Sequence, residues 1–401
     1  MKQPAPVRIR LLIPFFALTR GVLNTGFRMV YPFLPAIARG LGVDLEAVAL
    51  AVTIRSTVGL ASPLLASSAD QRGRKAMMLF GLGLFTGGLL LVTFWPTYLA
   101  LVAALLLSAA GKLIFDATMQ AYIGDQVAYA RRGLAIAISE LGWSGSFIVG
   151  IPLVGWLIAR AGWSAPFPIL AGLALIAAIL LYRILPADAP APEDRPSLQQ
   201  NFRAVLIHRA AVAALTVSLL TSAANEVVNI IYGAWIEDAF GLQVAALGAA
   251  SAVIGLAELG GEGLVAALTD RLGKRLAVGL GIGLNALACL ALPLLARSLA
   301  AALVGLFLFF ITFEFMIVSS FSLLSELLPR ARATLMAGNF AALSGGRALG
   351  ALIGPLLFPL GLMANSVSAV ALNGLALALL FLFVQVEQER RTPAVETPGQ
   401  G

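Results

Sequence analysis

The chain has few charged residues. Its 401 residues include 27 Lys+Arg and 20 Asp+Glu, which makes 12% charged, against about 25% in a soluble globular protein. Hydrophobic residues reach 60% before its 40 glycines are counted. A water-soluble fold of this size could not cover its surface with so few charges. The composition therefore excludes a cytosolic enzyme, a disordered protein and a nucleic-acid binder, and predicts an integral membrane protein.

Cysteine and histidine are almost absent. The single cysteine, Cys289, lies in an apolar run, and the single histidine, His208, lies in a polar connector. These counts exclude a disulfide framework and argue against a cysteine- or histidine-held metal or haem. The Gly-x-x-x-x-Gly-Lys-Ser/Thr phosphate loop is also missing, so nothing suggests ATP drive. We expect no cofactor, no metal and no enzymatic activity.

Long apolar segments fill most of the sequence. Each is near the roughly 20 residues that a helix needs to cross a bilayer, and none alternates as a barrel strand would. The first follows basic residues but lacks a small-residue cleavage site, so we expect a membrane helix rather than a signal peptide. The predicted spans are 11–36, 47–66, 76–95, 98–122, 133–159, 164–186, 210–236, 244–266, 276–295, 299–324, 334–358 and 362–385.

A Pro-rich polar connector divides the chain. We expect an N-terminal six-helix bundle at 1–186, a connector at 187–209, a C-terminal bundle at 210–386 and a polar tail at 387–401. Nineteen Lys and Arg fall in the even-numbered loops and the two tails, and three (Arg39, Arg160 and Arg297) in the odd-numbered loops. Because cytoplasmic loops retain positive charge, both termini are predicted to be cytoplasmic. The net charge of +7 then needs no polyanionic partner.

The two halves repeat each other in sequence. Asp70-x-x-Gly73-Arg74-Lys75 recurs 200 residues later as Asp270-x-x-Gly273-Lys274-Arg275. Asn24 and Tyr31 recur as Asn225 and Tyr232, and Asp125 is matched by Glu326, each 201 residues on. Parallel six-helix repeats are a common plan of secondary transporters, which bind substrate between the halves.

These features resemble the major facilitator superfamily over residues 11–386, with Ala66 where its loop signature has a leading glycine. The resemblance implies an all-α membrane protein of twelve transmembrane helices in two pseudo-symmetric six-helix bundles. It further implies a monomeric transporter in the cell (inner) membrane, with membrane lipid around it and a small-molecule substrate. It also implies a gating charge cluster in which Asp125 is a partner of Arg74. The expected gating-loop residues are Asp70, Gly73, Arg74, Lys75, Asp125, Asp270 and Gly273. Alternatively, Arg74 and Lys75 are only topology signals.

A glycine and proline pattern in the fifth span gives a second, partial resemblance. Gly142-x-x-Gly145-x-x-x-x-Gly150-Ile151-Pro152-x-x-Gly155 is similar to the pattern of the family's proton-driven drug exporters, with Ile151 separating a glycine and proline that are adjacent there. Close helix packing alone would require the same residues.

Ionisable residues inside the predicted spans are costly and call for a partner or a function. The cations are Arg20, Arg28, Arg55, Lys112 and Arg347; the anions are Asp116, Glu140, Glu226, Glu258, Glu262 and Glu314. Five cations face six anions, so at least one carboxyl lacks a cation, and a dry unpaired carboxyl takes up a proton. Arg20, Asn24, Arg28 and Tyr31 follow at helical spacing and form a polar stripe on the first span.

The substrate and proton-coupling candidates are Arg28, Arg55, Asp116, Glu140, Glu226, Glu314 and Arg347. We favour Glu226 and Glu314 as proton or substrate carboxyls. Arg28, Arg55 and Arg347 could neutralise them or could hold an anionic substrate. Several alternatives stay open. Lys112 and Asp116 could be a structural pair, Glu140 could brace a loop, and Glu258 and Glu262 could belong to a packing seam. Arg20, near a helix end, is expected to reach the interface.

The sequence therefore predicts a secondary active transporter that works by alternating access, with proton-coupled export (antiport) of amphiphilic or drug-like compounds. The expected cavity spans are rich in aromatic residues, which supports this substrate class: Phe15, Phe16, Phe27, Phe33, Phe115, Phe310, Phe313 and Phe315. The alternative is proton- or ion-coupled transport of an organic anion, sugar or other polar metabolite, with sodium as another possible coupling ion. A channel or a receptor is the rival from another class.

Overall fold

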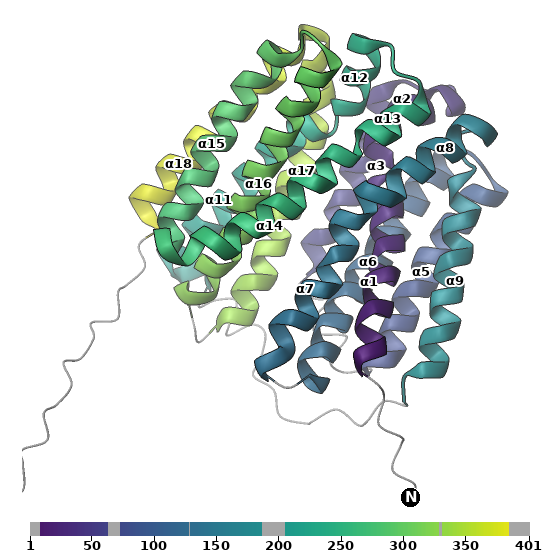
Figure 1. Cartoon of the computed structure of the whole chain (residues 1–401), viewed down its shortest axis with the longest axis horizontal. Coiled ribbons are helices and arrows are strands. Elements are labelled where there is room, and N and C mark those ends of the chain that lie inside the picture. The colour runs from purple at the N-terminus through teal and green to yellow at the C-terminus, as the bar shows by residue number, and fades with distance from the viewer. Residues whose placement is uncertain (1–8, 63–72, 128, 187–204, 329–330, 385–401) are drawn as a thin grey trace, which may run out of the picture.

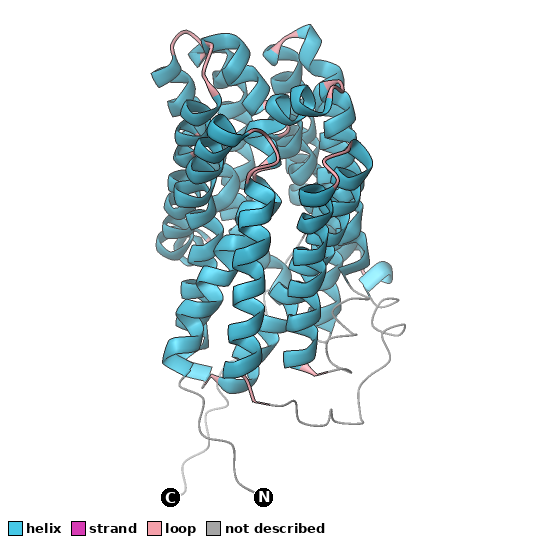
Figure 2. Cartoon of the chain, turned by 90° about the vertical axis from the view of Figure 1, so that its right-hand side faces the viewer, coloured by secondary structure: helices cyan, strands magenta, loops and turns pink. Residues whose placement is uncertain are grey.

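The computed structural model describes residues 9–62, 73–127, 129–186, 205–328 and 331–384, and every regular element in these ranges is helical (Figures 1 and 2). The N-terminal half contains α1 (Ile9–Arg28), α2 (Val30–Leu41), α3 (Leu45–Thr57), α5 (Arg74–Phe94), α6 (Tyr98–Gln126), α7 (Tyr129–Gly145), α8 (Ile151–Ala161) and α9 (Pro166–Ile184). The C-terminal half contains α11 (Arg209–Asn229), α12 (Tyr232–Phe240), α13 (Val244–Ala250), α14 (Ala252–Leu272), α15 (Lys274–Leu295), α16 (Leu299–Leu327), α17 (Arg332–Leu357) and α18 (Leu362–Phe383).

Taken together where they continue one another, these helices form twelve long helical segments that follow the predicted spans. Short 3-10 helices, Val58–Ala61 and Phe358–Leu360, extend α3 and α17. Ten of these segments are long and apolar enough by themselves to cross a membrane. The other two, α1–α2 and α3, carry Arg20, Arg28 and Arg55. The all-α, two-bundle architecture is confirmed (Figure 1).

Backbone geometry repeats between the halves. Six glycines in the described residues have positive φ, and they form three pairs separated by 199 or 200 residues: Gly42 and Gly241, Gly73 and Gly273, and Gly162 and Gly361. Gly73 and Gly273 have φ of 92° and 82°, a conformation that costs other residues energy. The hydroxyls of Thr97 and Ser298 cap α6 and α16 at equivalent places. The duplication seen in the sequence therefore extends to turn and cap geometry.

Two equivalent spans are broken near their centres. The first span is interrupted at Met29, between α1 and α2, and the seventh at Ile230 and Ile231, between α11 and α12. Broken helices near the bilayer midplane are a common feature of transporter binding sites. The fifth span contains a π-helix, Ser146–Gly150, just before Pro152. Proline has no backbone N–H to donate, so the regular α-helical hydrogen bonding is interrupted there.

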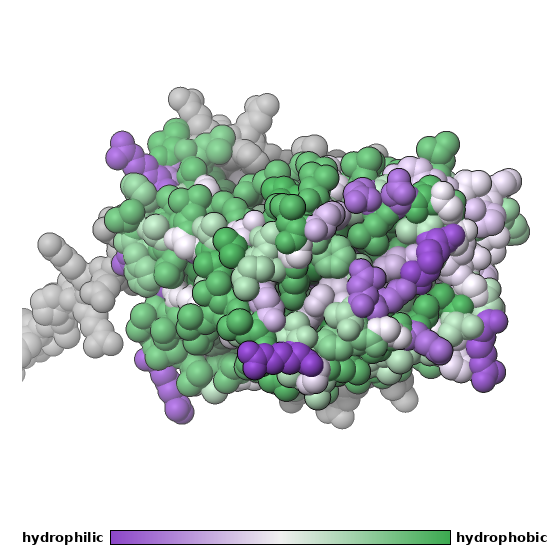
Figure 3. All heavy atoms as spheres, turned by 90° about the horizontal axis from the view of Figure 1, so that it is seen from above, coloured by the Kyte–Doolittle hydropathy of each residue, from purple (hydrophilic) through white to green (hydrophobic). Residues whose placement is uncertain are grey.

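The outer surface is apolar. On α15, Leu276, Leu280, Leu284, Leu287 and Leu294 are exposed along one helical face, as expected for a helix that faces lipid. In the view from the end away from the start of α1, hydrophobic residues (green) cover most of the surface, and hydrophilic residues (purple) gather mainly toward the right (Figure 3).

The halves touch at the end away from the start of α1 and also along α3 and α17, where the Ser62 hydroxyl donates to the Ala337 carbonyl at 3.2 Å. A β-carbon on Gly233 of α12 would lie 2.5 Å from the carbonyl oxygen of Pro32 in α2. One on Gly248 of α13 would lie 3.2 Å from the Cα of Gly155 in α8. An ion pair of 2.6 Å joins Arg39 to Glu237 there. Small residues thus allow backbone-to-backbone packing between the halves at this end.

Candidate functional site

The polar stripe on α1 is buried in the bundle. Arg20, Asn24, Arg28 and Tyr31 are each 5% exposed or less. A helix with charges on one buried face must direct them at partners on other helices, because lipid would reject them. The stripe meets three groups of side chains, one within the N-terminal half and two between the halves.

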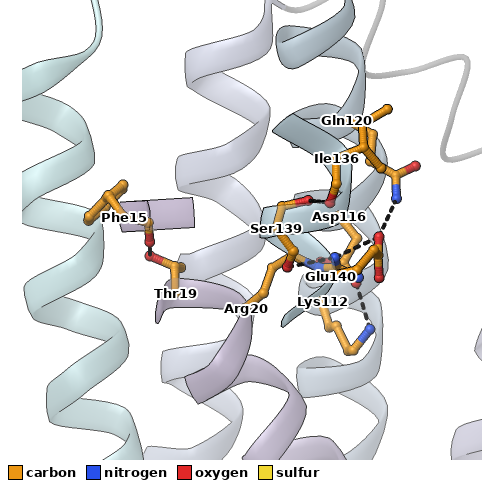
Figure 4. A network of polar contacts seen from close by, with 9 residues as sticks. All are labelled: Phe15, Thr19, Arg20, Lys112, Asp116, Gln120, Ile136, Ser139 and Glu140. Carbon is orange, nitrogen blue, oxygen red and sulfur yellow. Dashed lines mark hydrogen bonds and ion pairs between the residues drawn. The ribbon is translucent and has the colours of Figure 1, made fainter. Parts of the chain in front are cut away.

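Arg20 holds the first group together, within the N-terminal half (Figure 4). Its Nε lies 3.1 Å from Asp116 Oδ1 on α6, and its Nη1 lies 2.7 Å from Glu140 Oε1 on α7. Nη1 also donates to the Ser139 carbonyl at 3.0 Å. Lys112 Nζ contacts Asp116 Oδ2 at 2.6 Å. Charge-assisted hydrogen bonds of this kind fix three helices relative to one another.

This network corrects two expectations. Arg20 does not reach the membrane interface, because two carboxylates bind it in the bundle and leave it 4% exposed. Glu140 does not brace a loop but pairs with Arg20, and Gln120 donates to it at 3.4 Å. Lys112 and Asp116 form the expected pair along α6, and Arg20 joins them from α1.

Arg28 forms the second group, across the two halves. Its two terminal nitrogens bind both carboxylate oxygens of Glu258 on α14, with Nη1 to Oε2 at 2.9 Å. Nη1 also donates to the Trp143 carbonyl at 3.2 Å. The guanidinium carbon lies 3.9 Å from the ring centres of both Trp143 and Phe147. A buried bidentate pair, with aromatic rings beside the cation, therefore joins the halves.

Arg55 and Glu226 belong to the third group. Arg55 donates to the Phe27 carbonyl at 2.6 Å and to the Tyr31 hydroxyl at 2.8 Å, and its guanidinium lies 4.0 Å from the Phe27 ring centre. Glu226 Oε2 accepts from Asn229 at 3.0 Å, while its Oε1 is buried without a partner. Tyr31, Arg55 and Arg347 all interact electrostatically with this carboxyl. The group thus places two cations of opposite halves around one carboxyl.

Two predicted residues have no ion pair or hydrogen bond within the described residues. Glu314 on α16 is 8% exposed and lies within electrostatic range of Glu258, Glu262 and Arg28. A β-carbon on Gly261 of α14 would lie 2.6 Å from the β-carbon of Glu314, so α14 packs directly on Glu314. Arg347 on α17 is half-buried. The Glu314 carboxyl can therefore take a proton or a ligand, and Arg347, which interacts with Glu226 only electrostatically, can take an anionic ligand.

No ion pair of the described residues neutralises Glu226 or Glu314, although Arg55 and Arg347 interact electrostatically with Glu226 and Arg28 does so with Glu314. Arg28 binds Glu258 instead, and Arg55 binds a carbonyl and a hydroxyl. The sequence interpretation left Glu258 out as part of a packing seam, and left Arg20 out as well. Helical spacing was a reason to include Arg20 among the candidate site residues, since it lies on the same stripe as Arg28. No local signal links Arg28 to a residue 230 positions away. Phe16 and Phe115 were expected to line a cavity, but they pack edge-to-face in the core.

The loop residues form equivalent pairs in the two halves. Arg74 Nε lies 3.1 Å from Asp125 Oδ2, and Lys274 pairs with Glu326. Lys75 donates to the backbone carbonyl of Leu185, the residue that follows α9, at 2.7 Å. Arg275 donates to Phe381 near the end of α18 at 2.6 Å. These contacts lie within each half. Asp70 lies outside the described residues, and Asp270 lies in the last turn of α14, which ends at Leu272 just before Gly273.

Three of the four glycines in the fifth-span pattern are packing residues, whereas a β-carbon on Gly145 would meet nothing within 4 Å. A β-carbon on Gly142 would lie 2.4 Å from the Ala17 carbonyl, and one on Gly150 would lie 2.0 Å from Thr25 Oγ1. Gly155 faces Val244 of the other half, with its β-carbon 3.0 Å from that carbonyl. The span therefore packs tightly on α1 and on the C-terminal half, as the packing interpretation requires.

No metal centre is apparent in the part of the chain that the structure describes, where no three His, Cys, Asp or Glu side chains are grouped to hold an ion. His208 serves instead as the N-cap of α11, its Nδ1 accepting from the Ala211 amide at 3.2 Å. The site is therefore built from guanidinium, amine, carboxyl and aromatic groups.

Known proteins share this architecture. The inner membrane transport protein YdhP of Escherichia coli is 24% identical over 391 residues, which cover 96% of this chain and 99% of YdhP. A probable sugar efflux transporter of Helicobacter acinonychis is 30% identical over 176 residues, 43% of this chain and 44% of that protein. The fold matches a bacterial homolog to the human lysosomal transporter Spinster, in its inward-facing and occupied conformation. That match has a TM-score of 0.76 and 14% identity, over 95% of this chain and 97% of that one.

The sequence profile of the Major Facilitator Superfamily matches residues 16–225 and 214–400, nearly the whole chain. The two halves, their repeated loop pairs and the charged site between them agree with that match. The chain is a multi-pass membrane protein and a transporter, not an enzyme, and it belongs to the Major Facilitator Superfamily.

Proposed function

We propose that the protein is a proton-coupled exporter of amphiphilic small molecules, working as a monomer in the inner membrane with both termini in the cytoplasm. The observation that carries the proposal is Glu314, a carboxyl buried beside the other half without a cation of its own. Desolvation favours the neutral, proton-carrying form of such a carboxyl. Water or a cationic ligand in the site would favour its ionised form.

Alternating access would couple that proton to movement. The halves touch at the end that we predict to be external, and the Arg28–Glu258 pair and Tyr31 lie on the same interface. Opening that end requires these contacts to break. A ligand or proton that binds one state better than the other shifts the equilibrium between the two states by that difference in affinity.

The aromatic residues support an amphiphilic substrate. The rings of Trp143 and Phe147 lie against Arg28, and that of Phe27 lies against Arg55. Such a site offers ring faces to an apolar body and charged groups to a polar end. These pairings favour a molecule with both parts over a uniformly polar one.

Reconstituted vesicles test the proposal. We expect purified protein to move an amphiphilic dye against its gradient when a pH gradient is imposed, with saturable kinetics. Glu314→Gln should abolish the dependence on the pH gradient while leaving dye binding measurable. Glu46→Gln, at an exposed position in the first turn of α3, is the matched control and should behave as wild type. Flux through Glu314→Gln that responds to the gradient as wild type does would remove Glu314 from proton coupling.

A polar substrate is the second candidate. One support is the relative named as a probable sugar efflux transporter, which matches over 43% of this chain and 44% of its own length. The other is Arg347, which has no ion pair in the described structure. Sugars and organic anions belong in the same vesicle assay. Gradient-driven flux of one of these, with none of the dye, would favour this candidate and displace the amphiphile.

A further inference from the structure

The surroundings of Arg28 form a complete binding site for an organic cation. The faces of Trp143 and Phe147 flank its guanidinium, each ring centre 3.9 Å from Cζ. The Glu258 carboxylate accepts from both terminal nitrogens, and the Trp143 carbonyl accepts from one of them at 3.2 Å. Two ring faces, a carboxylate and a carbonyl are the groups that recognise guanidinium and ammonium ligands. Arg28 lies among them as a tethered cation.

The charge around this position also calls for a cation. Glu258, Glu262 and Glu314 of the C-terminal half interact electrostatically with one another and with Glu140, and Arg28 and Arg20 carry the guanidinium groups that offset them. Arg20, the next cation along α1, is already bound to Asp116 and Glu140, and Lys112 is bound to Asp116. Among these described residues, five carboxyls thus face three cations, so a further cation would improve the balance and an anion would worsen it.

Unsatisfied polar groups lie beside the same position. Asn24, one turn before Arg28 on the stripe, is fully buried, and neither atom of its amide group has a hydrogen-bond partner. Glu314 is more than nine-tenths buried and has no ion pair among the described residues. Buried polar groups are normally satisfied by protein, water or ligand. These two side chains therefore indicate a place for a ligand rather than a sealed core.

We infer that the substrate is an organic monocation with an apolar or aromatic body, and that its cationic group takes the place of Arg28 between Trp143, Phe147 and Glu258. This inference rests on the proposed function and names the substrate class for the same site. Because Arg28 and Glu258 belong to different halves, a cation that displaces Arg28 also removes a bond between the halves. Substrate binding would in this way weaken the contact between the halves and favour opening of the end that we predict to be external.

Chemical rescue tests the site directly. Ethylguanidinium matches the atoms that Arg28→Ala removes beyond the β-carbon. We expect Arg28→Ala to unfold at a lower temperature than wild type, and millimolar ethylguanidinium chloride to raise that temperature, as ligand binding to the folded state must. In wild type Arg28 occupies the site, and ethylguanidinium lacks the apolar body that the proposed substrate has, so the rise should be smaller than in Arg28→Ala. The double variant Arg28→Ala with Glu258→Gln should show no rise, with sodium chloride as the salt control. No rise in Arg28→Ala, or an equal rise in all three proteins, would overturn the inference.

A second measurement compares the binding of two ions to wild-type protein and uses Glu258→Gln to locate the site. Tetraphenylphosphonium and tetraphenylborate have nearly the same size and shape and opposite charge. We expect saturable binding of the phosphonium to purified protein, at least tenfold weaker in Glu258→Gln, and no saturable binding of the borate. Preference for the borate, or equal binding of both ions, would refute the cation site.

The two proposals fail separately. If the phosphonium binds but a pH gradient does not drive its flux, the cation site stands and proton-coupled export is wrong. If a pH gradient drives transport of neutral or anionic compounds and the phosphonium does not bind, proton coupling stands and the cation site is wrong.

Discussion

Gly350 of α17 lies so close to Glu226 of α11 that a β-carbon on Gly350 would stand 2.6 Å from the β-carbon of Glu226. Gly346 and Gly354, one turn to either side, meet the α11 backbone in the same way, with β-carbons that would lie 2.2 Å from the Leu219 carbonyl oxygen and 2.8 Å from the Val227 carbonyl oxygen. Small residues at four-residue spacing let two membrane helices approach closely. This seam fixes Glu226 beside Arg347, which lies on the same helix as the three glycines.

Replacing Gly350 with alanine should therefore destabilise the protein. Backbone atoms on α11 cannot yield as a flexible side chain could, so we expect a loss of roughly 1–3 kcal/mol, seen as a lower unfolding temperature. Gly283→Ala in α15 is the matched control, because a β-carbon there meets nothing within 4 Å. Equal unfolding temperatures for the two variants would show that the seam tolerates the extra carbon.

Arg20→Met should cost far more stability than the loss of a surface arginine. It leaves Glu140 without its guanidinium and Asp116 with Lys112 alone, and removing one partner of a buried ion pair costs about 3–5 kcal/mol. Arg160→Met, at an exposed arginine over the Trp156 ring, should cost less than about 1 kcal/mol. Thermal unfolding followed by tryptophan fluorescence measures both.

A double variant distinguishes the two causes of the stability loss in Arg20→Met, the unpaired carboxylate and the lost packing. Adding Glu140→Gln to Arg20→Met removes the unpaired carboxylate, so part of the lost stability should return. If Glu140→Gln lowers stability further by its full single-variant amount, the two side chains are not coupled and the network has been misread.

The two halves should respond alike to a change in their turn glycines. Gly73→Ala and Gly273→Ala each force alanine to adopt a φ near 90° (92° and 82° in the structure). We expect each to cost about 1–2 kcal/mol, and Gly172→Ala, in α9 with open space around it, to cost nothing. A large loss at one turn and none at the other would contradict the structural repeat.

The predicted orientation can be read by thiol labelling in intact cells. The only cysteine, Cys289, is fully buried, so wild type should not react with a membrane-impermeant maleimide. Arg297→Cys, at the end where the halves touch, should be labelled from outside. Arg271→Cys, at the end of α14, should be labelled only after the cells are opened. The reverse pattern would place the termini outside.

The sequence alone determined the spans, the repeat and the loop pairs, because each depends on local properties. Hydropathy over about 20 residues sets where a helix crosses a membrane. The offset of 200 residues in the glycine and charge pattern predicted equivalent turns at Gly73 and Gly273, which the backbone shows. Arg74 and Asp125 could be paired from the sequence because their loops lie at the same end of one bundle.

Only the tertiary structure decided which buried charges pair. The residues of the α1 stripe were visible in the sequence, but their partners depend on how helices from the two halves are rotated and how closely they pack. Arg28 and Glu258 are 230 positions apart, and Gly255, one turn before Glu258, lets α14 approach the Ser144 carbonyl of α7 closely enough for that pair to form. Short-range attraction between charges is strong only in such a dry contact. Helical periodicity gives the face of each helix, and packing between the halves selects the partner.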